Sequence, residues 1–234
     1  NRWRQMNIAE LYENPSRVVV TAHRGFSGEY PENTLLAFEE AVKAGADLVE
    51  FDLRGTKDYV PVVLHDSTVD RTSNGSGVPG DFTLEEIRLL NFSMWKGPGS
   101  SGVRLDKPAY PESSIPTFAE VLDCLKGRIG LNIQVYDASS PLLETICGLY
   151  HNYDLYAEGY LTMSTYIDAD QVRKINPRIE LCVLERQGDL DRGELAKQRD
   201  LGIRYIQPLH SMVTPEFCRM SNNLGFRSNM FYSN

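Results

Sequence analysis

Short apolar runs alternate with amphipathic stretches along most of the chain. The segment 130–136 shows the strand pattern most clearly, because Leu131, Ile133 and Val135 alternate with Asn132, Gln134 and Tyr136. The same pattern predicts eight strands, at residues 18–23, 48–52, 62–65, 130–136, 160–164, 179–184, 205–209 and 227–233.

Helix signals lie between most of these strands. A Thr followed three residues later by Glu is the capping-box pattern, and it predicts helix starts at Thr83 and Thr117. Further helices are expected after Asn33 or Thr34, from Ser140-Pro141, over 169–175, over 194–201 and from Thr214-Pro215. Strands joined mostly by helices predict an α/β fold, a parallel TIM (β/α)8-type barrel that forms one domain over residues 1–234.

Three segments depart from the simple alternation. Residues 1–16 form an N-terminal extension with a helical stripe of Trp3, Met6, Ile8 and Leu11, which is expected to plug the bottom of the barrel. The segment 53–60 is too short for a helical crossover, so the chain is expected to return in an extended form. Residues 91–115 are rich in Gly, Ser and Pro and predict a long functional or mobile loop.

Composition excludes some classes of partner. The net charge of −8 argues against nucleic acid or an anionic membrane as the main partner. No run of about 18 apolar residues predicts a membrane span. We expect a cytoplasmic protein that acts on a small molecule; since the sequence starts at Asn1, export with removal of a signal peptide is the alternative.

The candidate chemistry lies at the carboxyl ends of the predicted strands. His23, Glu50, Asp52, His65 and Gln134 all fall there, and barrels of this type carry their sites at that end. Glu50 and Asp52 are two positions apart and share one strand face. A buried Glu–Asp pair is costly unless a cation or basic group lies between the two carboxylates. Two histidines titrate near neutrality and can therefore act together as acid and base.

Several motifs resemble the glycerophosphodiester phosphodiesterase family. They lie within residues 18–72, in the family's order and approximate spacing, and read Ala22-His23-Arg24-Gly25, Pro31-Glu32-Asn33-Thr34, Glu50-Phe51-Asp52, Thr56-Lys57-Asp58, Val62-Val63-Leu64-His65-Asp66 and Asp70-Arg71-Thr72. Looser matches follow at residues 115–118, 131–133 and 163–166. The family fold is a TIM barrel, in agreement with the strand pattern.

The resemblance implies an activity and roles for particular residues. Members hydrolyse glycerol-linked phosphodiesters to glycerol 3-phosphate and an alcohol with a divalent cation, Mg²⁺ or Ca²⁺. Carried over by position, His23 and His65 are the catalytic acid and base, in an order that stays open, and Arg24 holds the phosphate. The same comparison implies Glu50, Asp52 and the position of Gln134 as metal ligands. Glu32 and Tyr136 are further candidates for substrate contacts, although Glu32 also has a plain helix-capping explanation.

Two features depart from the family pattern. The family has Glu and Lys where this chain has Gln134 and Tyr136. An amide oxygen can still bind a cation but carries no charge, and a phenol is neutral at pH 7. Arg54, on the face of Glu50 and Asp52, is a candidate for the missing positive charge. The family also continues past the last Asn with a helix and a strand, so we expect the closing segment of the barrel to be absent, deleted or outside the given sequence.

Three functions therefore remain open. The first is a metal-dependent phosphodiesterase, a phosphoric diester hydrolase. The second is a weakened or inactive barrel that binds a phosphodiester or a polyol phosphate. The third is a lyase-type phosphodiesterase that forms a cyclic phosphate. All three use the same fold, so the fold alone does not decide between them.

Overall fold

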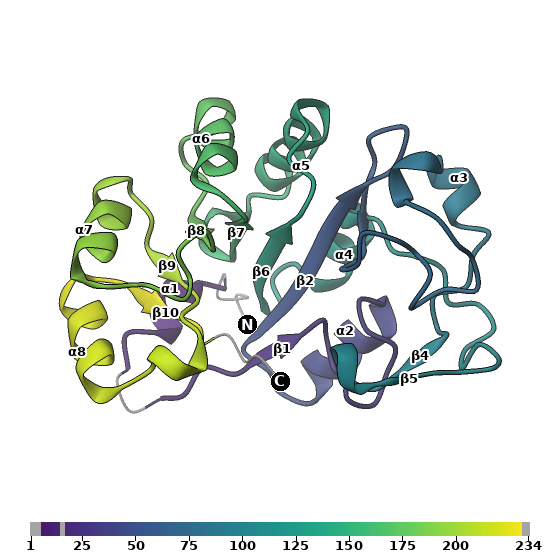
Figure 1. Cartoon of the computed structure of the whole chain (residues 1–234), viewed down its shortest axis with the longest axis horizontal. Helices are drawn as coiled ribbons and strands as arrows, with labels where there is room; N and C mark the ends of the chain where they lie inside the picture. The colour runs from purple at the N-terminus through teal and green to yellow at the C-terminus, as the bar shows by residue number, and fades with distance from the viewer. Residues whose placement is uncertain (1–5, 15–16, 231–234) are drawn as a thin grey trace, which may run out of the picture.

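A computed structural model describes residues 6–14 and 17–230. Its main sheet runs in the order β1-β2-β6-β7-β8, and every neighbouring pair in that order is parallel. Strand β9 lies beside β8 and pairs in parallel with β10, which extends the curved wall (Figure 1). The seven parallel strands are β1 (Thr21–His23), β2 (Leu48–Gly55), β6 (Gly130–Val135), β7 (Gly159–Met163), β8 (Leu181–Val183), β9 (Tyr205–Ile206) and β10 (Arg227–Ser228).

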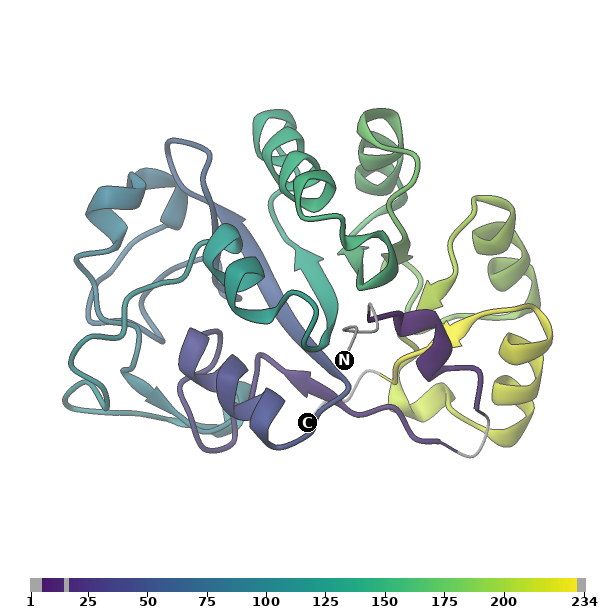
Figure 2. The same cartoon turned by 180° about the vertical axis from the view of Figure 1, so that it is seen from behind.

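Helices on the outside connect the successive parallel strands (Figures 1 and 2). They are α2 (Leu35–Lys43), α4 (Phe118–Leu125), α5 (Ser140–Asn152), α6 (Tyr166–Ile175), α7 (Arg192–Asp200) and α8 (Pro215–Asn223). This arrangement confirms the predicted TIM-type α/β fold. None of the helices in the described ranges combines the length and the hydrophobicity that a bilayer crossing needs.

The helix starts follow the predicted capping signals. Thr34 caps α2 by accepting a hydrogen bond from the backbone of Ala37. Complete capping boxes begin α4 at Thr117 and the short α3 (Leu84–Ile87) at Thr83. Each box satisfies backbone N–H groups that have no partner inside the helix, so local sequence alone determines these boundaries.

Alternation along the strands separates two cores. Odd-numbered residues such as Phe51, Ile133 and Leu161 face the helices and join the main core cluster. Even-numbered residues face the barrel interior, where Leu48 and Tyr160 belong to a second cluster. The polar residues Glu50, Asp52 and Gln134 occupy the same interior face nearer the carboxyl ends of the strands.

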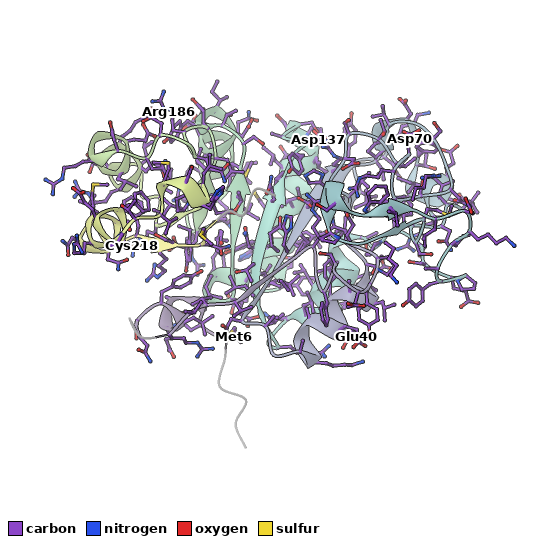
Figure 3. All side chains as sticks on the ribbon, turned by 60° about the horizontal axis from the view of Figure 1, so that its bottom comes forward. Met6, Glu40, Asp70, Asp137, Arg186 and Cys218 are labelled. Atoms are coloured by element: carbon purple, nitrogen blue, oxygen red, sulfur yellow. The ribbon has the colours of Figure 1, made fainter. Side chains whose placement is uncertain are left out.

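The short helix α1 (Ile8–Leu11) closes the bottom of the barrel. Ile8 is buried in the interior cluster with Met6 and Leu11 packed against it, which confirms the predicted plug for these three residues. Trp3 lies outside the described residues. Figure 3 shows Met6 at the opposite end of the molecule from Asp137, which lies two residues beyond the end of β6, so the plug and the strand carboxyl ends are far apart.

The prediction that the third strand runs parallel to the others was wrong. Strand β3 (Pro61–Val63) pairs with β2 in the antiparallel sense, with Leu53 opposite Val63. The connection between β2 and β3 leaves room for a hairpin turn but not for a crossover helix. His65 therefore reaches the carboxyl end of the barrel from the top of a hairpin.

The two ends of the curved wall meet without a backbone ladder in the described part of the chain. A side-chain hydrogen bond spans this seam, from the Thr21 hydroxyl to Asn229 Oδ1 at 3.3 Å. The predicted strand 227–233 is confirmed at Arg227–Ser228, and its last three residues lie outside the described ranges.

The long segment 91–115 is mostly irregular, as predicted, but it contains a small hairpin. Its strands are β4 (Trp95–Lys96) and β5 (Val103–Arg104), and they flank the 3₁₀ turn η2 (Gly99–Ser101). The remaining 3₁₀ turns are η1 (Pro79–Asp81), η3 (Leu155–Ala157) and η4 (His210–Met212).

Candidate active site

The predicted site residues meet at the carboxyl end of the sheet. His23 ends β1 and lies in register with Glu50 on β2, and Asp52 lies in register with Gln134 on β6. Tyr136 follows β6 directly, and its backbone N–H bonds to the Leu53 carbonyl of β2. Strand register alone therefore gathers residues that are more than a hundred positions apart in the sequence.

His23 and Glu50 form the first half of the site. Nε2 of His23 lies 3.8 Å from Oε2 of Glu50, and both residues line a groove of about 1000 Å³ beside β1. Burial and the nearby Arg24 lower the pKa of His23. Burial and then the neighbouring Asp52 raise the pKa of Glu50 well above its usual range. Glu50 is therefore an acid whose charged form needs a nearby cation.

Asp52 is held by side chains from the loop after β1. Asn33 Nδ2 donates to Asp52 Oδ2 at 2.8 Å, and Nε of Arg24 lies 3.5 Å from the same oxygen. Arg24 and Asn33 both adopt left-handed backbone conformations, with φ near 57° and 58°, and Asn33 N–H bonds to the Arg24 carbonyl. Such conformations are uncommon for residues other than glycine and are typical of functional loops.

An alternating charge chain joins Arg24 to His65. We use this name for the residues Arg24, Glu32, Arg71, Asp66 and His65, in that order. Arg24 Nη1 donates to Glu32 at 2.9 Å, Arg71 donates to both Glu32 and Asp66, and Asp66 Oδ1 lies 2.7 Å from His65 Nδ1. The charge chain therefore links Arg24, the candidate phosphate-binding residue, to His65, one of the two candidate catalytic histidines.

The two carboxylates inside the charge chain are stabilised in their charged forms. Burial opposes ionisation of Glu32, but the hydrogen bonds and charges of Arg71 and Arg24 outweigh it and lower its pKa. Burial likewise opposes ionisation of Asp66, and hydrogen bonds from His65 and Arg71 lower its pKa. Both oxygens of Glu32 already accept from arginines, so a direct contact between Glu32 and substrate stays a prediction.

Asp66 determines which nitrogen of His65 is available. Since Asp66 engages Nδ1, the ring presents Nε2 for proton transfer. The His65 ring also contacts Tyr136 edge-to-face, with centroids 5.3 Å apart. The N–H of Leu64, the residue before His65, bonds to the Asp52 carbonyl at 3.0 Å, so His65 follows directly on a contact with the strand of the acidic pair.

The hairpin β4–β5 supports the charge chain from outside. The Arg71 guanidinium lies over the Trp95 ring, 5.1 Å from its centroid. Arg104 donates to the backbone carbonyls of Asp70, Arg71 and Ser73, which holds the loop that carries Arg71. The sequence analysis assigned no role to Arg71, Trp95 or Arg104. Arg71 does lie in the motif Asp70-Arg71-Thr72, which was the one available signal.

The interior oxygen donors fit a hard divalent cation. Glu50, Asp52 and the buried amide of Gln134 share one face and offer the carboxylate and carbonyl oxygens that such a cation prefers. Asn33 Oδ1 is buried beside them without a hydrogen bond. In the described part of the chain no group of three His, Cys, Asp or Glu side chains is arranged to hold a metal. The third oxygen donor proposed here is the amide of Gln134.

Comparison with known proteins gives a consistent match. Residues 23–200 match the model of the family described as "Glycerophosphoryl diester phosphodiesterase family". A Bacillus subtilis relative is 35% identical over 198 residues, which cover 83% of this chain and 77% of that protein. A protein of Caldanaerobacter subterraneus subsp. tengcongensis named glycerophosphodiester phosphodiesterase is 31% identical over 204 residues, 86% of this chain and 79% of that protein.

Solved structures show the same fold. The glycerophosphodiester phosphodiesterase from Agrobacterium tumefaciens has a TM-score of 0.77 at 23% identity and covers 93% of this chain and 88% of its own. An Oleispira antarctica phosphodiesterase, solved in complex with the product sn-glycerol-3-phosphate, has a TM-score of 0.75 at 23% identity over 93% of this chain and 85% of its own.

Proposed function

The chain belongs to the glycerophosphoryl diester phosphodiesterase family, and we propose that it hydrolyses glycerophosphodiesters to glycerol 3-phosphate and an alcohol with the help of a divalent cation. The observation that carries the proposal is the placement of two imidazoles around one acidic pair. His23 lies beside Glu50, and His65, oriented by Asp66, follows Leu64, whose N–H bonds to the Asp52 carbonyl. The solved complex of a structural neighbour with sn-glycerol-3-phosphate supports this choice of product.

The two histidines divide the proton transfers. The lowered pKa of His23 favours its neutral form, which suits a general base that takes a proton from the attacking water. The water oxygen bonds to phosphorus while the bond from phosphorus to the alcohol oxygen breaks. His65, oriented by Asp66 through Nδ1, donates its Nε2 proton to the leaving alkoxide.

Charge in the pocket stabilises the phosphoryl oxygens. Arg24 lies at the centre of the site, and its Nη2 has no hydrogen-bond partner among the described residues. The oxygens of Glu50, Asp52 and Gln134 would hold the cation, Mg²⁺ or Ca²⁺, which when bound supplies positive charge to the phosphate. Nε of Arg24 lies 3.5 Å from Oδ2 of Asp52, and this contact limits the repulsion between Asp52 and Glu50 before substrate binds.

One observation favours a weaker enzyme as the second candidate. Gln134 contributes an uncharged donor, and Tyr136 contributes a phenol whose pKa is raised by burial, by Asp52 and by Glu50, so it stays neutral at physiological pH. Both features reduce the charge available for binding, so we expect slow turnover or weak affinity for the cation.

Release of glycerol 3-phosphate from glycerophosphocholine tests the proposal. The wild-type chain is assayed with Mg²⁺ or Ca²⁺ beside His23→Ala, His65→Ala and the matched control His151→Ala, whose ring contacts Tyr156 on the outside of the barrel. We expect each site variant to lose about 10²- to 10⁴-fold in kcat and the control to keep its activity. Equal activity of wild type and His23→Ala would sink the proposed roles.

A further inference from the structure

Arg54 is a fixed guanidinium inside the site. It lies on the interior face of β2, two residues beyond Asp52, and is partly buried. Its Nε and Nη2 donate to the His65 carbonyl at 2.9 and 2.7 Å. Its central carbon lies 4.7 Å from the centroid of the Tyr136 ring. Two hydrogen bonds and one aromatic face therefore hold the group in a defined orientation.

Arg54 differs from the other two arginines of the site. Arg24 and Arg71 each contact carboxylates, whereas no carboxylate oxygen in the described ranges lies within 4.0 Å of the Arg54 guanidinium nitrogens. A partly buried cation without a carboxylate in direct contact is costly, and an anionic ligand would supply that contact.

One edge of the Arg54 guanidinium is available to a ligand. Nη1 donates to no described residue, and it is not among the buried polar atoms that lack a partner, so it is accessible from outside the protein. The Tyr136 ring contacts both Arg54, 4.7 Å from its central carbon to the ring centroid, and the His65 ring, with centroids 5.3 Å apart. Arg54 therefore lies beside His65 at the carboxyl end of the strands.

We propose that Arg54, held in place by Tyr136 and the His65 carbonyl, is a second phosphate-binding residue of this site. It contacts an anionic phosphoryl oxygen of the diester substrate and of the phosphate monoester product. The proposal rests on the phosphodiesterase function proposed above. Guanidinium groups bind phosphate through strong charge-assisted hydrogen bonds, and no carboxylate of the described residues forms an ion pair with Arg54.

Binding of sn-glycerol 3-phosphate, measured by calorimetry, tests the proposal apart from turnover. We expect Arg54→Gln to weaken binding by about 10- to 100-fold and Arg54→Lys to weaken it less. The matched control is Arg178→Gln, because Arg178 also stacks on a tyrosine, Tyr156, at 3.9 Å but on the outside of the barrel. This control should bind as tightly as wild type. Equal affinity of Arg54→Gln and wild type would overturn the proposal.

A double variant separates charge from support of the His65 loop. In Arg54→Gln/Tyr136→Lys a lysine replaces the tyrosine ring that contacts position 54. This variant restores a positive charge but does not restore the two hydrogen bonds to the His65 carbonyl. We expect it to recover most of the lost affinity. If Arg54 only positioned His65, Arg54→Gln would lower kcat at unchanged affinity for glycerol 3-phosphate, and the double variant would recover nothing.

Two substrates identify which anion Arg54 contacts. Glycerophosphoethanolamine and glycerophosphoserine share the phosphodiester, but only the second adds a carboxylate. A phosphate contact predicts that Arg54→Gln raises KM for both by a similar factor; an effect confined to glycerophosphoserine contradicts it. A wild-type chain with no turnover refutes the proposed function, while the calorimetry still decides the role of Arg54.

Discussion

Removing Arg71 breaks the middle of the charge chain. Its Nη1 and Nη2 donate to the two oxygens of Glu32 at 2.9 and 2.7 Å, and its Nε and Nη2 donate to Asp66 at 2.6 and 2.9 Å. The Glu32 side chain is 2% exposed, and those of Arg71 and Asp66 are 20% and 26% exposed. Arg71→Gln therefore leaves one buried and one partly buried carboxylate without their main partner.

The expected cost is large for a single substitution. Breaking a buried ion pair costs roughly 3–5 kcal/mol, and the partial exposure of Asp66 favours the lower end, about 3 kcal/mol. For a chain of this size each kcal/mol lowers Tm by about 2–4 °C, so Arg71→Gln should lower Tm by about 6–12 °C. Arg71→Lys keeps the charge but not the planar fork, and it should fall between Arg71→Gln and wild type.

Thermal unfolding followed by circular dichroism measures this effect. The matched control is Arg88→Gln, which removes a surface ion pair with Glu120 at 2.6 Å whose side chains are 37% and 42% exposed. A surface pair contributes at most about 1 kcal/mol, so the control should lose less than about 4 °C. If Arg71→Gln lowers Tm no more than Arg88→Gln does, the charge chain does not stabilise the site as argued.

Three further predictions concern the same pocket. Gln134→Glu adds a carboxylate opposite Asp52 and should strengthen Mg²⁺ or Ca²⁺ binding by about 10-fold; an unchanged Kd in calorimetry contradicts the assigned donor role. Asp66→Asn removes the acceptor of His65 Nδ1 and should lower kcat by about 10- to 100-fold at nearly constant KM in steady-state assays, less than loss of the imidazole itself. The pKa of Glu32 is lowered by folding, so its stabilisation is present above its ordinary pKa of 4.5 and is lost as pH falls through the lower folded value. The Tm difference between wild type and Glu32→Gln should thus be largest near about pH 7 and shrink below about pH 4; a constant difference refutes this sign.

Much of the barrel could be predicted because its signals are local. Thr34 and Thr117 bond to backbone groups within their own helix ends, and alternation along 130–136 determines which residues enter the interior. The direction of the strand at Pro61–Val63 could not be read from its apolar residues, because an apolar run fits a parallel or an antiparallel neighbour equally well. The short connection before it was the physical signal for a hairpin.

The sequence could predict those site residues whose positions depend only on their place along a strand. Glu50 and Asp52 share a face because they are two residues apart, and strand register brings Gln134 beside them. The pairing of Arg71 with Glu32, 39 positions away, depends on two irregular loops with no periodicity, and so does the stacking of Arg71 on Trp95. The sequence indicated Arg54 as a candidate cation, but only the structure shows that it bonds to the His65 carbonyl and forms no ion pair with a carboxylate of the described residues.

Phosphorus NMR of glycerophosphocholine incubated with the purified chain and Mg²⁺ tests the central claim most directly. With water activated by one imidazole and the leaving alcohol protonated by the other, the diester resonance should give way to the monoester resonance of glycerol 3-phosphate. A diester signal that does not change over time, or one replaced by a stable cyclic phosphate, would contradict hydrolysis by the pair His23 and His65.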